Sequence, residues 1–227
     1  QILYRDISNA FGPFSVYFCA LLFKIFGVSL ITLALFNAFL IWIMAQMIFR
    51  IFSWLGNRRD GMVASSCFLL LFAFSQYTSA NYNFVTPYKF EALHGTFFFL
   101  SLIYLFVNFY VRGRNYMLLL AGLCCGAGLM TCAEIAGAVI IASFFWFAAP
   151  FLALCFGAGT LVVPCGFLFF LWLWQGFPFP EALLNTFSAI LSPMQHPEVM
   201  QTPFYQRILG TDNLWMNLFL TSASAAL

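Results

Sequence analysis

The sequence is short of charged residues. Only 7% of its 227 residues are Asp, Glu, Lys or Arg, whereas 63% are hydrophobic. Ordinary soluble domains carry about a quarter charged residues, so this composition excludes a soluble globular fold. The nine basic residues are spread along the chain, and no basic tract exists that could bind a phosphate backbone. A nucleic-acid partner is therefore excluded as well.

Several familiar motifs are also missing. The chain has no Walker motif, no glycine-rich dinucleotide loop, no G-x-S-x-G elbow and no zinc-ligand spacing. These absences argue against an ATPase, a dinucleotide-dependent enzyme and a serine hydrolase. The seven cysteines include no C-x-x-C pair and fall in or beside apolar segments, so we interpret them as small core residues. The sequence names no cofactor, and a divalent metal stays an open alternative.

Long apolar runs dominate what is present. Runs of eighteen or more residues recur, and such runs are typical of transmembrane helices. No initiator Met and no signal peptide opens the chain, and a last apolar run stops at Leu227. We therefore predict an all-α polytopic membrane protein. We expect one integral membrane domain over residues 1–227, a fragment that lacks its first span and its C-terminal part.

The apolar runs predict about six spans, in whole or in part. Pro13–Phe26 is too short, at 1.5 Å per residue, to cross roughly 30 Å of hydrocarbon. We therefore expect an interfacial helix there, ended by Gly27. The long polar loop Gln175–Asn213 has a second predicted interfacial helix at Pro180–Leu191. The predicted spans are Ser29–Phe49, Gly61–Tyr77, Glu91–Val111, two within Tyr116–Pro150, Phe151–Trp174 with a kink at Pro164, and a truncated span from Leu214.

Two short loops hold five of the nine basic residues. Residues 50–60 carry three arginines and residues 112–115 carry two. The positive-inside rule predicts that both loops are cytoplasmic. The other side then receives the N-terminal segment, the turn before the third span and the long loop after Trp174. Six of the seven carboxylates fall on that outer side: Asp6, Glu91, Glu134, Glu181, Glu198 and Asp212.

The turn at Asn81–Gly95, N-Y-N-F-V-T-P-Y-K-F-E-A-L-H-G, is the strongest candidate for a site. Glu91 stands at the mouth of a predicted helix, where the helix dipole stabilises a carboxylate whether or not it has a function. A functional role is favoured because Tyr88, Lys89 and His94 share the turn. Glu91 and His94 can lie on one helix face. A single Glu-x-x-His is weak support for metal binding, so we assign no metal ligands.

Other candidates have structural alternatives. Asp6 either forms a surface ion pair with Arg5, worth little, or belongs to the site. Glu134 lies in an outer turn between two spans or, if residues 116–150 form one helix, near the membrane midplane. The length of that segment favours the turn. Arg207 is the outer-side residue best suited to bind phosphate, through bidentate guanidinium contacts, although a solvated loop residue is the simpler interpretation.

Four stretches together resemble the GT-C membrane glycosyltransferases. Tyr4–Gly27, which begins Y-R-D and contains G-P and L-F-K-I-F-G, resembles the first outer loop of the bacterial relatives of dolichyl-phosphate-mannose-protein mannosyltransferases and of the aminoarabinose transferase. Thr86–Gly95 resembles the acidic start of a later span. Ala121–Glu134 resembles the family's A-G-x-x-x-G-x-x-x-x-T-K-x-E, and Phe204–Asn213 fits a late outer loop. The resemblance covers nearly the whole chain in the right order.

The resemblance implies a GT-C-like helix bundle in a bacterial inner membrane with its active face outward. It implies inverting transfer of a sugar from a polyprenyl-phosphate donor to a glycan, lipid or protein acceptor, with a carboxylate as general base. Glu91 and Asp6 are the implied catalytic residues here, and the main base is implied to lie upstream of Gln1. The donor phosphate and substrate are expected to meet Lys89, Arg207, Tyr88, His94 and Glu134.

Two other hypotheses remain. Cys132 stands where relatives often have lysine, so a catalytically inactive relative with a structural role is one alternative. The other is a polytopic transporter or flippase of a lipid-linked or small polar substrate. A transporter should line a central path with charges, whereas an enzyme of this kind should gather its carboxylates at the outer surface.

Overall fold

The computed structural model describes residues 3, 5, 12–74, 84–85, 90–131, 138, 150–195 and 215. The secondary-structure elements in these ranges are helices, which confirms the all-α class for the described residues. The chain divides into two compact units, Gln1–Ile190 and Leu191–Leu227. The helices below belong to the first unit, apart from the last residues of α9. The expectation of one integral domain stays a prediction.

The first helix, α1, has the bounds that the sequence predicts, Pro13–Phe26. Pro13 takes the first helical position, where its missing N–H costs nothing. Gly27 ends the helix with φ +87°, a value that side chains disfavour, and its N–H donates to the Phe23 carbonyl at 3.0 Å. The placement of α1 in the membrane interface stays a prediction.

The second helix, α2 (Leu30–Leu55), begins as predicted and ends later than predicted. The Ser29 hydroxyl caps it by accepting from the Ile31 N–H at 3.1 Å. The predicted end at Phe49 is wrong, because Arg50 is a good helix former and α2 continues for another turn and a half to Gly56.

The predicted loop at residues 50–60 is also wrong, because these residues are helical apart from Gly56 and Asn57. Asn57 is the cap of α3 (Arg58–Phe68), and its side chain accepts from the N–H groups of Arg59 and Asp60. The Asp60 carboxylate in turn accepts from the Asn57 N–H at 3.0 Å. This capping box starts the helix at Arg58. The helix continues through η1 (Leu69–Ala73), and residues 75–77 of the predicted span lie outside the described residues.

Within the described residues, three helices are long and apolar enough to cross a membrane: Leu30–Leu55, Phe90–Arg112 and Ala153–Trp174. The second is α4, Phe90–Arg112, within one residue of its predicted bounds at each end. The third joins α7 (Pro150–Phe169), which contains Pro164, to η3 (Phe170–Trp174). The helix α5, Tyr116–Leu129, has 14 residues and ends in a turn at Met130 and Thr131. Six spans stay a prediction.

The predicted interfacial helix Pro180–Leu191 is divided into two. The structure has α8 at Phe179–Thr186 and α9 at Ser188–Gln195, separated by Phe187. The Thr186 hydroxyl donates back to the Ala182 carbonyl at 2.7 Å. Phe187 has φ −102° and ψ 20°, outside the helical region, and its N–H donates to the Leu183 carbonyl at 3.3 Å.

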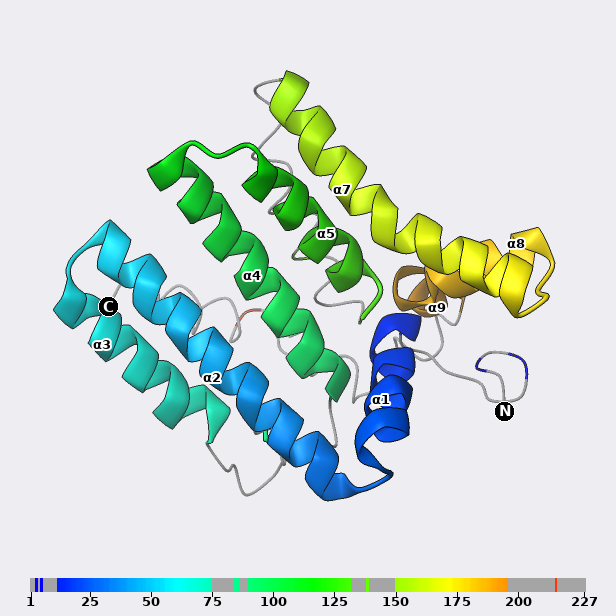
Figure 1. Cartoon of the computed structure of the whole chain (residues 1–227), viewed down its shortest axis with the longest axis horizontal. Coiled ribbons are helices and arrows are strands. Elements are labelled where there is room, and N and C mark those ends of the chain that lie inside the picture. Colours follow the sequence, from blue (N-terminus) through cyan, green and yellow to red (C-terminus); the bar gives the residue numbers. More distant parts are fainter. Residues whose placement is uncertain are drawn as a thin grey trace. The chain divides into compact units, whose positions relative to one another are not determined.

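In the first unit, α3, α2, α4, α5 and α7 lie side by side in that order (Figure 1). The helices α2 and α4 run in the same direction, since Phe36 contacts His94 near their starts and Arg50 contacts Tyr104 further along. The helices α5 and α7 also run parallel to each other. Gly122 lies against Phe156, and Gly126 one turn later lies against Thr160.

These directions give the helix row two ends of different composition. At one end, called the basic end, α2 leads into α3 and α4 leads into α5, and the guanidinium of Arg112 lies 5.7 Å from the centroid of the Trp54 ring. The two arginine-bearing segments therefore lie at the same end of the helix row, and their cytoplasmic placement stays a prediction. The opposite end, called the site end, holds the starts of α2 and α4 and the ends of α5 and η3.

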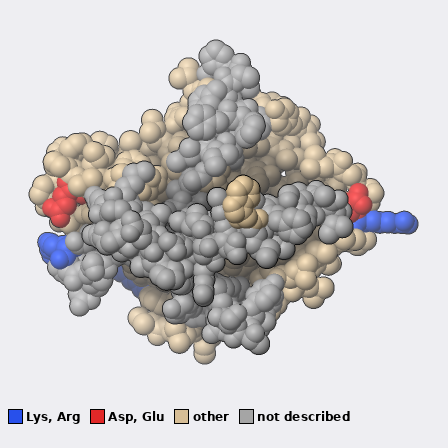
Figure 2. All heavy atoms as spheres, turned by 180° about the vertical axis from the view of Figure 1, so that it is seen from behind, with Lys and Arg blue, Asp and Glu red and all other residues tan. Residues whose placement is uncertain are grey.

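The described carboxylates follow the same division. Glu91 begins α4 and Glu181 lies in α8, which packs on Leu171 through Ala182, so both belong to the site end. Asp60 belongs to the basic end. Most of the described surface visible in Figure 2 is uncharged, with blue and red side chains in only a few places. Which end faces the cytoplasm stays a prediction.

Candidate functional site

The first two turns of α4 carry the two predicted site residues that the structure describes. Glu91 is half-buried in this turn, and His94 follows one turn later with only 3% of its surface exposed. A carboxylate in the first turn is stabilised by the N-terminal end of the helix dipole. The sequence correctly predicts that α4 begins at this position and that both side chains belong to the first two turns.

The imidazole of His94 is enclosed by aromatic rings from three elements. Ring centroids lie 5.4 Å away for Phe18 of α1, 6.2 Å for Phe36 of α2 and 6.1 Å for Phe90 of α4 itself. Its Nδ1 atom is buried and has no hydrogen-bond partner within the described part of the chain. Aromatic walls disfavour a charged imidazole, so His94 offers a neutral ring with an unused polar atom.

The N-terminal end of α1 joins the C-terminal end of α5. The Gly12 N–H donates to the Thr131 carbonyl at 2.8 Å, and the Phe14 N–H donates to the Met130 carbonyl at 3.2 Å. A Cβ atom at Gly12 would overlap the Met130 carbonyl, so this approach of two backbones requires glycine. The Phe14 ring also contacts Phe98 of α4 edge-on, with centroids 5.0 Å apart. Three segments that are distant in sequence therefore meet at the site end.

The pKa of the Cys19 thiol in α1 indicates that this helix lies close to Glu91. Burial and, as the smaller cause, the negative charge of Glu91 together raise the pKa of Cys19 to about 12. Cys19 is buried on the face of α1 that packs into the helix row. The carboxylate of Glu91 thus lies where α1 and α4 approach each other.

On its other side, α1 contacts the last turns of α7. The Tyr17 ring meets Phe167 and Phe170 edge-on, at centroid distances of 5.2 and 5.5 Å. Burial raises the pKa of the Tyr17 phenol, which keeps it protonated. Helix α1 therefore spans the site end from α2 and α4 to η3, and its position is fixed by contacts on both sides.

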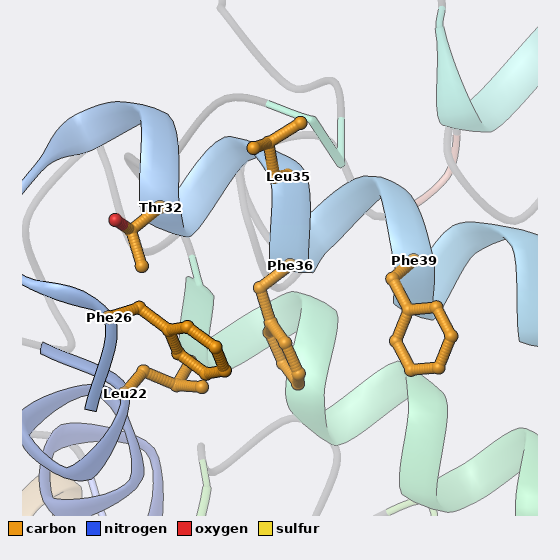
Figure 3. Close-up of a pocket in the computed structure, with 6 residues that line it drawn as sticks. All are labelled: Leu22, Phe26, Thr32, Leu35, Phe36 and Phe39. Carbon is orange, nitrogen blue, oxygen red and sulfur yellow. The ribbon is translucent and has the colours of Figure 1, made fainter.

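An apolar cavity of about 440 Å³ opens between α1 and α2 (Figure 3). Its one polar lining group, the Thr32 hydroxyl, donates to the Gly27 carbonyl at 3.2 Å. Phe36 lines this cavity and also contacts His94, so the cavity adjoins the aromatic enclosure. It suits a hydrocarbon chain. The lining residues are Leu22, Phe26, Thr32, Leu35, Phe36 and Phe39.

The remaining predicted site residues, Asp6, Tyr88, Lys89, Glu134 and Arg207, lie outside the described residues, as does Cys132. Two described residues near them in sequence, Gly12 and Thr131, are joined by a backbone hydrogen bond. Phe90 directly follows Lys89, Thr131 precedes Glu134 by three positions, and Gly12 follows Asp6 by six. Within the described residues no group of three His, Cys, Asp or Glu could hold a metal ion. A divalent metal therefore stays an open alternative with no assigned ligands.

Sequence reasoning missed the aromatic enclosure of His94 and the cavity beside it. Phe18 and Phe36 are two of 32 phenylalanines, and nothing in their local sequence distinguishes them from the others. It also missed the amide of Asn37, which is buried in α2 and donates to the Val85 carbonyl at 3.4 Å. An asparagine inside an apolar run was the one available signal, because buried polar groups require partners.

The chain matches no protein-family model, no curated protein and no solved structure.

Proposed function

We propose that this chain is the membrane part of a GT-C-type glycosyltransferase. It transfers a sugar from a polyprenyl-phosphate donor to an acceptor at the outer face of a bacterial inner membrane. One observation carries the proposal: helix α1, which follows Asp6 in the chain, contacts both α4, which follows Lys89, and the end of α5, which precedes Glu134. These contacts lie at one end of the helix row, away from five of the nine basic residues. General-base catalysis needs a carboxylate at the surface where acceptor and donor meet.

Glu91 has the chemistry for this role. It begins α4, where the helix dipole favours the ionised carboxylate, and it lies beside the buried face of α1. An ionised carboxylate can accept the proton of an acceptor hydroxyl as that hydroxyl attacks the sugar. In this proposal Asp6 and Glu134 support the same site, and Lys89 and Arg207 hold the donor phosphate, where cations stabilise the negative charge of the leaving group.

The apolar cavity between α1 and α2 suits the donor lipid. Branched and aromatic side chains line it, and its one hydroxyl is already used within the chain. Its neighbour Phe36 contacts His94, which follows Glu91 by one turn of α4. A polyprenyl tail in this cavity would therefore place its phosphate end near the first turn of α4.

The transporter alternative receives less support. Such a protein should carry charges along a path through its interior. The buried polar residues in the described part of the chain include no Asp, Glu, Lys or Arg; they are Ser15, Asn37, His94, Ser101, Asn108, Thr131, Thr186 and Ser188. The described interior is thus polar in places without being charged.

The test is cleavage of the sugar–phosphate bond. The full-length protein, reconstituted in liposomes, is incubated with a panel of radiolabelled polyprenyl-phosphate sugars and a membrane extract as acceptor source. We expect release of free polyprenyl phosphate together with label in a new product. Movement of intact donor across the bilayer without bond cleavage would contradict the proposal and favour a flippase.

A further inference from the structure

A second cavity, of about 380 Å³, opens between α2 and α4 nearer the basic end. Five of its lining residues recur every one to four positions along α2, so they form one stripe of that helix. From Trp42 to Arg50 this stripe extends about 12 Å at 1.5 Å per residue. The lining residues are Trp42, Ile43, Gln46, Met47, Arg50 and Tyr104.

The end of the stripe nearest the basic end is polar and positively charged. The Arg50 guanidinium is exposed and donates to the Tyr104 hydroxyl at 3.2 Å. Arg50 forms no ion pair with a carboxylate among the described residues. The Tyr104 hydroxyl accepts from Arg50 and still has its own proton to donate. A guanidinium and a hydroxyl donor side by side form a good site for a phosphate group.

Neighbouring aromatic residues hold this pair in place. The Trp54 ring stacks on Tyr104 with centroids 5.5 Å apart and an interplanar angle of 24°. The Arg112 guanidinium lies 5.7 Å from the centroid of the same indole, a cation–π distance. Two arginines from different helices are therefore joined through two stacked rings, which adds positive charge beside the cavity and limits the movement of Tyr104.

The rest of the cavity is apolar. Met47, Ile43 and Trp42 follow Arg50 along α2 in the direction of the site end. A free phosphate ion would use only the Arg50 end and leave this apolar part without a ligand. A molecule with a phosphate at one end and a hydrocarbon chain at the other uses the whole stripe.

We propose that this groove binds one anionic phospholipid from the leaflet around the basic end. The phosphate lies between Arg50 and Tyr104, Gln46 hydrogen-bonds the ester region, and an acyl chain follows α2 to Trp42. The positive-inside prediction assigns this end to the cytoplasmic leaflet, which carries the anionic lipids. The site is separate from the proposed sugar-transfer site, which lies at the opposite end of α4.

The test is lipid binding to the purified full-length protein, measured by native mass spectrometry. The probes are phosphatidylglycerol and phosphatidylcholine with identical acyl chains. We expect tighter binding of phosphatidylglycerol, and we expect Arg50→Gln to weaken it by about fivefold. Phosphatidylcholine, whose phosphate is neutralised by its own choline cation, should lose less. Ile43→Trp, which fills the apolar part, should weaken both lipids.

Arg59→Gln is the matched control, because it removes the same charge at the same end outside the groove. Phosphatidylglycerol binding should stay within twofold of the unmodified protein. An equal loss in Arg50→Gln and Arg59→Gln would overturn the proposal in favour of general attraction to a positive surface. Displacement of phosphatidylglycerol by excess inorganic phosphate would also overturn it, because the ligand would then be a free anion.

Discussion

The two ends of the helix row differ in both charge and packing. The basic end has short loops, capping bonds within α3, and two arginines that contact aromatic side chains, Arg112 over the Trp54 ring and Arg50 at the Tyr104 hydroxyl. The site end joins segments that are far apart in sequence, through backbone bonds from α1 to α5 and ring contacts from α1 to α2, α4 and α7. The basic end therefore combines local capping bonds with contacts between α2 and α4, whereas the site end depends on tertiary contacts among α1, α2, α4, α5 and α7. A site built from several segments requires the second arrangement.

The largest expected effect distinguishes the carboxylates of the two ends. Glu91→Gln should lower the rate of sugar transfer by about 10²–10⁴, the usual contribution of a general base, with little change in the binding of the lipid donor. The measurement is kcat and KM in the liposome assay. Asp60→Asn at the basic end is the control and should leave kcat unchanged. Equal rates for the Glu91 variant and the unmodified protein would remove Glu91 from the catalytic residues.

The next effect concerns the close packing of α5 against α7, two helices that extend from the basic end to the site end. A Cβ atom at Gly122 would overlap the Phe156 carbonyl, whereas one at Gly166 would meet no atom within 4 Å. Gly122→Leu should therefore lower stability by about 1–3 kcal/mol or more through overpacking. Thermal unfolding of the purified protein measures the loss. Gly166→Leu should have no comparable effect, and a similar loss in both variants would contradict the close packing of these helices.

A smaller effect tests the capping bond that starts α3 at the basic end. Asn57 caps α3 through its side chain, whereas Asn115 stands before α5 with no capping bond from its side chain. Asn57→Ala should lower the free energy of unfolding by about 1 kcal/mol, and Asn115→Ala should leave it unchanged. Chemical denaturation of the two variants provides the comparison. The reverse order of stabilities would show that the cap at Asn57 is not formed.

The smallest effect tests how close Glu91 lies to α1. Because the pKa of Cys19 is about 12 instead of 9.0, its thiol stays protonated at pH 8 and alkylates slowly, since the thiolate is the nucleophile. Glu91→Gln removes a negative charge, so the pKa of Cys19 should fall and its alkylation should become faster at a given pH. Mass spectrometry follows the modification, with exposed Cys67 and Cys165 as internal controls. If the pH dependence of Cys19 alkylation is the same in Glu91→Gln and the unmodified protein, Glu91 does not lie close to Cys19.

The sequence predicted the helices better than their junctions. Apolar runs and strong local signals, such as Pro13 at a helix start and Gly27 at its end, predicted α1 and α4 within one residue. The predictions failed at Arg50 and Asn57, where a charged or polar residue suggested a loop. Arg50 is instead held by Tyr104 of another helix, and Asn57 forms a capping box whose strength depends on geometry.

The candidate site was predicted in part for a similar reason. Glu91 and His94 stood out because charged and titratable residues are rare in this chain. The rings that enclose His94 could not be predicted, since the contact of Phe18 with His94 joins residues that are 76 positions apart. Which of many similar phenylalanines meet is decided by the packing of α1 against α2 and α4, and that packing leaves no local pattern.

The most direct test of the central claim is to measure which side of the membrane each end of the helix row faces. Asp6→Cys, Glu134→Cys and Arg59→Cys are each introduced into a variant without the seven native cysteines, and sealed cells are treated with a membrane-impermeant maleimide. The account predicts labelling at positions 6 and 134 in sealed cells, and labelling at position 59 only after permeabilisation. Labelling of positions 6 and 134 from opposite sides of the membrane would contradict a single site built from these segments.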